Sequence, residues 1–345
     1  MKSSHYLICF LLGGCFMINP HLILAQKTEI KGFIDVRTWY DKEKEKLSFG
    51  LGEQDLFITS TLSDRFSFLG ETVFKYDASS TTKFSVSIER IVLKYNVGGN
   101  HNILLGKHHT PLNYWNDTYH HGRLFFPTID RPLLFSSEII PIHTTGIDFQ
   151  GHDLGSLRFG YDLMFGNGLA SDDVVDNDAH KSITAAVHIK PANNLRIGAS
   201  FYNDIISAGS TVHGEVHPHQ VDQHQYSASI AYFGKKFELL TEGALVTNKT
   251  DSTGTKQTIS TYIYGGYKLN EKLTLYFRLD QQQFEEGEVY FHPDDATLLL
   301  LGSRCQINYL TVVKLEYQYK EDQPGGEDSP ARFQNLITAQ VAIGF

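Results

Sequence analysis

Cysteine is almost absent from this sequence. Only three of the 345 residues are cysteines, and two of them, Cys9 and Cys15, fall in an apolar N-terminal segment. If that segment is removed, Cys305 stands alone. One cysteine can form neither an intramolecular disulfide nor a metal site built from cysteines.

Long apolar runs and an excess of positive charge are also missing. Beyond residue 25 the longest apolar run of note is Leu298 to Leu301, whereas a membrane helix needs roughly 20 apolar residues. The chain could therefore cross a membrane only as strands. The formal net charge is -9 and no basic run stands out, which argues against nucleic acid as a partner. We expect no cofactor.

The N-terminus has the pattern of an export signal. Lys2 precedes an apolar run at residues 6–16, and Ala25 offers a small residue at a cleavage point before Gln26. This pattern predicts a signal peptide over residues 1–25 and a single mature domain over residues 26–345. A second interpretation stays open, because Leu12 to Cys15 resembles a lipobox in which Cys15 would carry a lipid.

Apolar and polar residues alternate through the mature chain. Such alternation is typical of a sheet whose two faces meet different solvents. In residues 273–280 we expect one face to meet lipid and the other to meet water: Leu275, Phe277 and Leu279 on the first, Tyr276, Arg278 and Asp280 on the second. The pattern predicts about sixteen strands, at residues 28–40, 54–62, 66–77, 84–96, 101–108, 144–151, 156–166, 181–190, 194–203, 224–233, 236–247, 257–269, 272–283, 296–307, 311–320 and 333–345.

The connections between these strands alternate in length. Short turns, such as residues 63–65 and 152–155, alternate along the chain with longer and more polar connections, such as residues 41–53, 109–143 and 248–256. This asymmetry and an even strand count are typical of an all-β transmembrane antiparallel barrel with about 16 strands (range 14–18) and both termini in the periplasm. A secreted β-sandwich is the alternative, but polar residues opposite every apolar stripe favour a closed barrel with a wet interior.

Two local features refine this prediction. In residues 84–95 the alternation changes phase, which a bulge at Glu89 and Arg90 would explain. The final strand alternates onto Phe345, and a closing strand that ends in Phe resembles the signal that the outer-membrane barrel assembly machinery reads. That machinery, outer-membrane lipid and lipopolysaccharide are therefore the expected partners.

The third long connection, residues 109–143, carries many aromatic and charged residues. At this point the chain resembles Gram-negative outer-membrane porins, in which the third outer loop folds into the barrel and narrows the channel. The resemblance is one of topology and size, so the subfamily stays open between general porins and the phosphate-selective porins O and P, although no lysine run supports phosphate selectivity. We expect five aromatic residues of the loop to pack on the inner wall: Tyr114, Trp115, Phe125, Phe126 and Phe135.

The resemblance implies a pore bounded by this loop and by the barrel wall. Candidate constriction residues are Lys107, Arg123, Asp130, Arg131 and Glu138. Candidate lumen-wall residues are Arg37, Arg158, Arg196, Arg278, Asp280, Arg304, Lys314 and Glu316. Charges of both signs predict weak ion preference, because strong selectivity needs one sign concentrated at the constriction.

Other constellations have modest interpretations. His213, His217, His219 and His224 are weak candidates for metal binding, with a solvated loop as the alternative. Asp172, Asp173, Asp176 and Asp178 could share a divalent cation with lipopolysaccharide, but a solvated acidic loop is the favoured interpretation. Ser136, Ser137, Glu138 and His143 follow no hydrolase motif, so we expect no enzyme.

These observations predict a porin that passes small hydrophilic solutes and ions by passive or mildly selective diffusion. The alternative is a non-conducting binding or assembly component of the outer membrane whose barrel is plugged. The solute stays open, as does association into a homotrimer.

Overall fold

The computed structural model shows a closed antiparallel β-barrel. It describes residues 27–119, 122–170, 175–212, 215–291, 294–324 and 330–345. The expected leader, residues 1–25, lies outside the described residues. The barrel occupies residues 27–344, so the fold predicted from alternation is confirmed.

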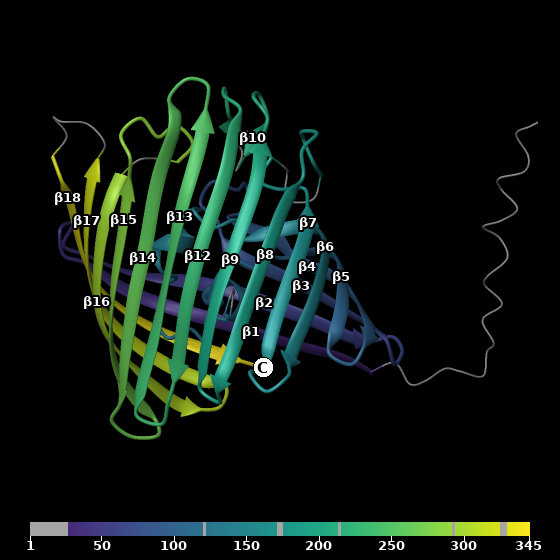
Figure 1. Cartoon of the computed structure of the whole chain (residues 1–345). Helices are drawn as coiled ribbons and strands as arrows, with labels where there is room; N and C mark the ends of the chain where they lie inside the picture. The colour runs from purple at the N-terminus through teal and green to yellow at the C-terminus, as the bar shows by residue number, and fades with distance from the viewer. Residues whose placement is uncertain (1–26, 120–121, 171–174, 213–214, 292–293, 325–329) are drawn as a thin grey trace, which may run out of the picture.

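Sixteen strands form the wall, and each pairs with its neighbours in chain order. They are β1 (Lys27–Asp41), β2 (Lys46–Thr61), β3 (Phe66–Tyr76), β4 (Phe84–Gly98), β5 (His101–His109), β6 (His143–Leu154), β7 (Phe159–Gly166), β8 (Ser182–Ala192), β9 (Leu195–Ile206), β12 (Val221–Phe233), β13 (Phe237–Thr250), β14 (Gly254–Lys268), β15 (Leu273–Phe284), β16 (Asp294–Asn308), β17 (Thr311–Pro324) and β18 (Arg332–Gly344). The long strands β12 to β15 run side by side in Figure 1, with β1 and β2 crossing behind them. Among the described residues, no helix is long and apolar enough to cross a membrane.

The barrel closes where β1 pairs with β18. Their register runs from Phe33 opposite Gly344 to Asp41 opposite Leu336. The chain end reinforces the seam, because Gly32 and Phe345 exchange two backbone hydrogen bonds of 3.0 Å. Gly32 is required here, since a Cβ atom at this position would lie 2.5 Å from the ring of Phe345.

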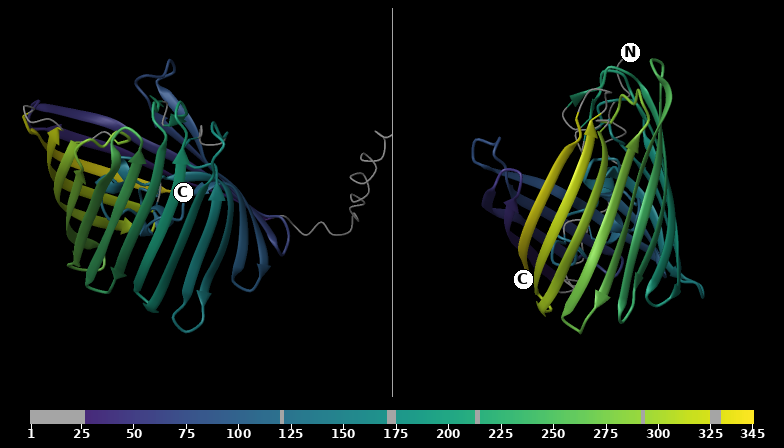
Figure 2. Two further views of the ribbon diagram at one scale, coloured as in Figure 1. Left: turned by 45° about the horizontal axis from the view of Figure 1, so that its top comes forward. Right: turned by 90° about the vertical axis from the view of Figure 1, so that its left-hand side faces the viewer.

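The predicted change of phase in β4 is a β-bulge. Glu71 of β3 pairs with Arg90 and Thr72 pairs with Ile88, so Glu89 has no partner in the register. Pairing between β4 and β5 begins only at Ile91. The upper part of the β3–β4 hairpin therefore stands away from β5, as the left view of Figure 2 shows.

The two faces of the wall differ as the sequence predicts. On β15 the outward side chains of Leu275 and Phe277 are 45% and 43% exposed, whereas Arg278 and Asp280 point inward and are fully buried. Outward aromatic pairs lie near both ends of the barrel, such as Phe66 with Tyr95, and Tyr319 with Phe333. An apolar belt between aromatic girdles is the outer surface of a transmembrane barrel.

Connections at one end of the barrel, here called the turn end, have two to four residues. The other end, here called the loop end, carries the long ones, including a connection at residues 207–220 that contains the short hairpin of β10 (Thr211–Val212) and β11 (Glu215–Val216). Two predicted long loops are wrong. β2 begins at Lys46, which leaves residues 42–45 as a turn, and β13 and β14 extend to leave only residues 251–253.

Candidate functional site

The connection between β5 and β6, residues 110–142, folds into the barrel and is called the inner loop here. Its neck is held by the backbone N–H of Thr110, which donates to the carbonyl of Ile142 at 3.0 Å. The amide of Asn116 donates to the carbonyls of the same two residues, at 2.9 and 3.0 Å. Two short helices lie in the loop, α1 (Tyr114–Thr118) and α2 (Leu133–Ser136).

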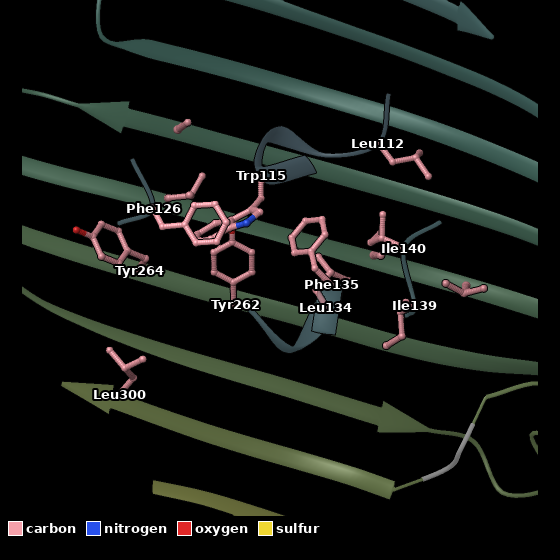
Figure 3. Packing of buried hydrophobic residues seen from close by; sticks show 14 of the residues in the cluster. Leu112, Trp115, Phe126, Leu134, Phe135, Ile139, Ile140, Tyr262, Tyr264 and Leu300 are labelled. Carbon is pink, nitrogen blue, oxygen red and sulfur yellow. The ribbon is translucent and has the colours of Figure 1, made fainter. Parts of the chain in front are cut away.

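An apolar cluster fixes the loop to the wall formed by β12 to β16. Trp115 is 1% exposed, and its ring centroid lies 5.1 Å from that of Phe126 and 6.2 Å from that of Tyr262 on β14 (Figure 3). Burying a large apolar side chain contributes roughly 1.5–3 kcal/mol. The predicted packing is confirmed for Trp115, Phe126 and Phe135, but Phe125 is 58% exposed and contacts Phe33 at the edge of its ring.

Three wall carboxylates accept hydrogen bonds from the backbone of the inner loop. Glu242 of β13 accepts from the N–H groups of Tyr114 and Trp115. Asp280 of β15 accepts from Leu133 at 2.9 Å. Glu316 of β17 accepts from Ile129 at 2.6 Å. These contacts fix the loop at three points of the wall.

Three wall cations bind the carbonyl oxygens of the same loop. Arg278 donates to the carbonyl of Asp130 at 2.7 Å and to that of Arg131 at 3.3 Å. Lys314 donates to the carbonyls of Arg123 and Thr128 at 2.8 and 2.9 Å, and Arg304 donates to that of Pro127 at 3.3 Å.

The wall charges of β15, β16 and β17 therefore have a different role from the one predicted. All of them point inward, as expected. They lie beneath the inner loop and hold it, rather than facing an open lumen: Arg278, Asp280, Arg304, Lys314 and Glu316. Two of the three cations also pair with wall carboxylates: Arg278 lies 2.8 Å from Asp280, and Arg304 lies 2.9 Å from Glu238.

On its other side the inner loop reaches β1 and β2 through arginine–carboxylate pairs. Arg123 of the loop lies 3.0 Å from Glu53 of β2, and Asp130 lies 2.6 Å from Arg37 of β1. Arg131 interacts electrostatically with Glu53 and with two further acids, Glu89 and Asp55. These pairs place charges of both signs beside the barrel seam, where β1 pairs with β18.

Asp130 lies between two of these arginines. Burial inside the barrel alone would raise the pKa of its carboxyl group. The charges of Arg37 and Arg123 outweigh burial and hold the pKa below the ordinary value of 3.8. Asp130 is therefore ionised at neutral pH and acts as the shared acceptor of the bridge between loop and wall.

Polar cavities lie on both sides of this charged contact. The cavity toward the loop end has a volume of about 750 Å³ and is lined by the constriction candidates Arg123, Asp130, Arg131 and Glu138. The cavity toward the turn end has a volume of about 450 Å³ and is lined by residues of β1 to β7 and by the start of the inner loop. The loop thus separates two spaces that carry ionisable side chains.

Two of the predicted site residues, Lys107 and Arg158, lie elsewhere, and a third, Arg196, lies in the wall as predicted but is paired. Lys107 lines neither cavity, and its ammonium group donates to the carbonyl of Ile88 at 2.8 Å. Arg158 is not in the wall, because it lies in the turn before β7 with a φ of 47° and donates to the carbonyl of Ala192. Arg196 does point inward, and it pairs with Asp117 of the inner loop at 2.6 Å.

The other constellations make local contacts. His217 packs on the ring of Tyr290, His224 lies 3.4 Å from Asp222, and His213 lies outside the described residues, as do Asp172 and Asp173. Within the described part of the chain, no group of three or more His, Cys, Asp or Glu residues could hold a metal ion. His143 lies 3.2 Å from Glu89 and lines the loop-end cavity with Ser136 and Glu138.

Sequence reasoning missed Glu53 as a site residue because it placed residues 41–53 in a loop. The missed signal is the alternation of Leu47, Phe49 and Leu51 with small residues. Gly50 lies against Trp39 and Gly52 against Asp35, so both glycines are inward positions of a strand.

The closed sixteen-stranded barrel with an inward third loop has the fold of outer-membrane porins. No protein-family model matches the sequence, and no curated protein matches it. Each of three solved structures with this fold aligns with 93% of the chain. An anion-selective porin from Comamonas acidovorans has a TM-score of 0.67 and 12% identity over 100% of its chain. The outer membrane channel DcaP of Acinetobacter baumannii has a TM-score of 0.66 and 14% identity over 97% of its chain. OmpT in trimer form, an outer membrane protein of Vibrio cholerae, has a TM-score of 0.66 and 14% identity over 100% of its chain.

Proposed function

We propose that this protein is an outer-membrane porin that passes small hydrophilic solutes and ions by diffusion. One observation carries the proposal. Inside a closed barrel with an apolar outer belt, cavities lined by ionisable side chains lie on both sides of a firmly anchored inner loop. Sixteen strands enclose more space than side chains fill, so the lumen can hold water. The inner loop then sets the narrowest part of the path.

Weak ion preference is part of the proposal. The loop-end cavity is lined by five Lys or Arg residues and four Asp or Glu residues, so neither sign dominates. Several of these charges already neutralise one another, as in the pair of Arg123 with Glu53. Strong selectivity would need a surplus of one sign beside the constriction. No catalytic role is proposed for any residue.

The same proposal gives the protein its place in the cell. A leader over residues 1–25 directs export, and the turn end with both termini faces the periplasm. Phe345 is the contact for the barrel assembly machinery, and the outer belt meets lipid and lipopolysaccharide. OmpT of Vibrio cholerae, which has the same fold, is described in a trimer form. On this likeness the proposal includes a homotrimer for this chain.

A plugged barrel is the second candidate, and one observation favours it. The inner loop is bound along half of the barrel wall, through its anchors on β13 to β17 and through the pairs of Arg123 and Asp130 with β2 and β1. A barrel occupied in this way could serve as a binding or assembly component without conducting.

A liposome-swelling assay distinguishes the two candidates. Purified protein, shown to be folded by heat-modifiable migration, is reconstituted and challenged with sugars of increasing size. A porin gives swelling rates that fall as the sugar becomes larger. A folded barrel that gives no swelling even with the smallest sugar contradicts the channel and leaves the plugged barrel.

A further inference from the structure

Two carboxylates lie side by side on the wall of the turn-end cavity, away from the inner-loop anchors. Asp148 of β6 and Asp162 of β7 both line this cavity of about 450 Å³. Gln150 lies directly opposite Asp162 in the register, and Asp148 lies two residues earlier on the same face of β6. The three side chains therefore form one patch on adjacent strands.

The amide of Gln150 is held between the two carboxylates. Its Nε2 atom lies 3.4 Å from Oδ2 of Asp148 and 3.4 Å from Oδ1 of Asp162. Its Oε1 atom can only accept, so Nε2 of His152, at 2.8 Å, is the donor. His152 thereby orients the amide so that both carboxylates share one NH2 group through long hydrogen bonds.

Asp148 is left with an open acceptor. Its side chain is almost completely buried, with 1% exposure, and Oδ1 has no hydrogen-bond partner among the residues that the structure describes. A buried acceptor without a partner is unfavourable, because it has lost its hydrogen bonds to water and gained none in return. An acceptor of this kind on a cavity wall fits a ligand that brings both a positive charge and an N–H donor.

The surroundings concentrate negative charge on one side of the cavity. Asp117 of the inner loop faces the same space and adds a third carboxylate, which is paired with Arg196 at 2.6 Å. Lys94 lines the cavity from β4, in the register row of Leu104 and Asp148. Two strand spacings separate the backbones of Lys94 and Asp148 by about 10 Å. Among the described residues, no ion pair joins their side chains.

We propose that Asp148 and Asp162 form a binding site for the primary ammonium or guanidinium group of a small organic cation that passes through the turn-end cavity. One N–H group would fill the open acceptor of Asp148 while its charge neutralises the pair. The proposal rests on the proposed channel function, because the ligand reaches the site through the lumen. Two carboxylates and an amide recognise an N–H donor by geometry as well as by charge.

Block of single-channel current in a planar bilayer tests the site. The probes are n-butylammonium, which carries N–H donors, and tetramethylammonium, which has the same charge and none. Butylammonium added from the turn end should interrupt the current at lower concentrations than tetramethylammonium does. Asp148→Asn should raise the half-blocking concentration about tenfold or more, because hydrogen bonds to charged groups are worth about 1.5–3 kcal/mol.

Two further variants keep the test decisive. Asp162→Asn should weaken the block in the same direction, and it reports on the site if Asp148→Asn does not fold. Asp153→Asn makes the same chemical change at a position of β6 that does not line the cavity, so its block should equal that of wild type.

The failures are distinguishable. Normal conductance with equal block by both probes, or with block unchanged in Asp148→Asn and Asp162→Asn, would overturn the binding site and leave the channel intact. Absence of any conductance from the folded wild-type barrel would overturn the channel itself.

Discussion

Asp280 accepts a hydrogen bond of 2.9 Å from the backbone N–H of Leu133, a residue 147 positions earlier in the chain. The same carboxylate lies 2.8 Å from Arg278, which in turn donates to two carbonyls of the inner loop. Alternate positions of one strand thus bind the donors and the acceptors of one loop segment. The loop is positioned by charges on the wall as well as by its apolar cluster.

Removal of one member of this buried pair should destabilise the barrel. In Arg278→Leu, Asp280 remains as a buried charge without its arginine, which costs about 3–5 kcal/mol. The free energy of unfolding, measured by urea titration of the refolded protein in micelles, should fall by about that amount. Arg65→Gln, in an exposed turn, should change it by less than about 0.5 kcal/mol.

The double variant Arg278→Leu with Asp280→Leu provides the control for charge burial. It removes both charges, so it should recover part of the stability lost in Arg278→Leu. The single variant Asp280→Leu completes the comparison. If the double variant loses more free energy of unfolding than Arg278→Leu and Asp280→Leu lose together, the pair acts on the loop in another way.

The two loop arginines should contribute positive field at the constriction. Arg123→Gln with Arg131→Gln removes two positive charges beside Glu53 and Glu89 and should shift ion preference toward cations several-fold, because a unit charge about 4 Å from an ion is worth about 1 kcal/mol in water. The measurement is the reversal potential in a KCl gradient. Arg65→Gln with Arg158→Gln removes two arginines from the turns instead, and an equal shift in that variant would place the selective field outside the inner loop.

Asp130 should make the barrel sensitive to acid. Its pKa is lower in the folded state than the ordinary 3.8, so ionised Asp130 contributes stability that is complete above the unfolded pKa. That contribution is lost as the pH falls through the folded pKa. Between pH 5 and pH 2, a range that includes the ordinary pKa of an aspartate, the free energy of unfolding should therefore fall further in wild type than in Asp130→Asn. Parallel urea titrations give the difference, and parallel losses in both proteins would mean that the bridge to Arg37 and Arg123 does not stabilise the fold.

The chain end should govern assembly. Phe345 exchanges two hydrogen bonds with Gly32 and packs its ring on that glycine. Deletion of Phe345, or Phe345→Asp, should slow the appearance of the heat-modifiable form in cells. Phe333→Asp changes an outward aromatic residue of the same strand away from the seam and is the matched control. If assembly is slowed only in Phe333→Asp, the assembly signal does not lie in the terminal residue.

The strands of the barrel wall could be predicted from the sequence, because the alternation that defines a strand involves only neighbouring residues. Alternation at residues 273–280 gives the correct facing, and the change of phase at Glu89 gives the bulge. The predicted start of β2 is wrong, because Gly50 and Gly52 lower the apparent strand propensity of this segment. In the structure these glycines make room for the side chains of Trp39 and Asp35.

The site could be predicted only in part. The inward loop follows from length and composition, but the bonds that hold it join residues far apart in the chain, such as Ile129 with Glu316. Periodicity says that Lys314 and Glu316 face inward, and it does not say what covers them. The carboxylate of Asp148 escaped notice for the same reason, because its environment comes from β7 and the inner loop.

Single-channel recording of wild type and of a deletion of residues 112–138 tests the central claim most directly. The account holds that the inner loop, bound to the wall from β13 through the seam to β2, narrows a water-filled barrel. Wild type should therefore give discrete current steps, and the deletion variant, shown to be folded by heat-modifiable migration, should give larger ones. Equal conductance in the two folded proteins would contradict the account, since the loop would then not bound the path of the ions.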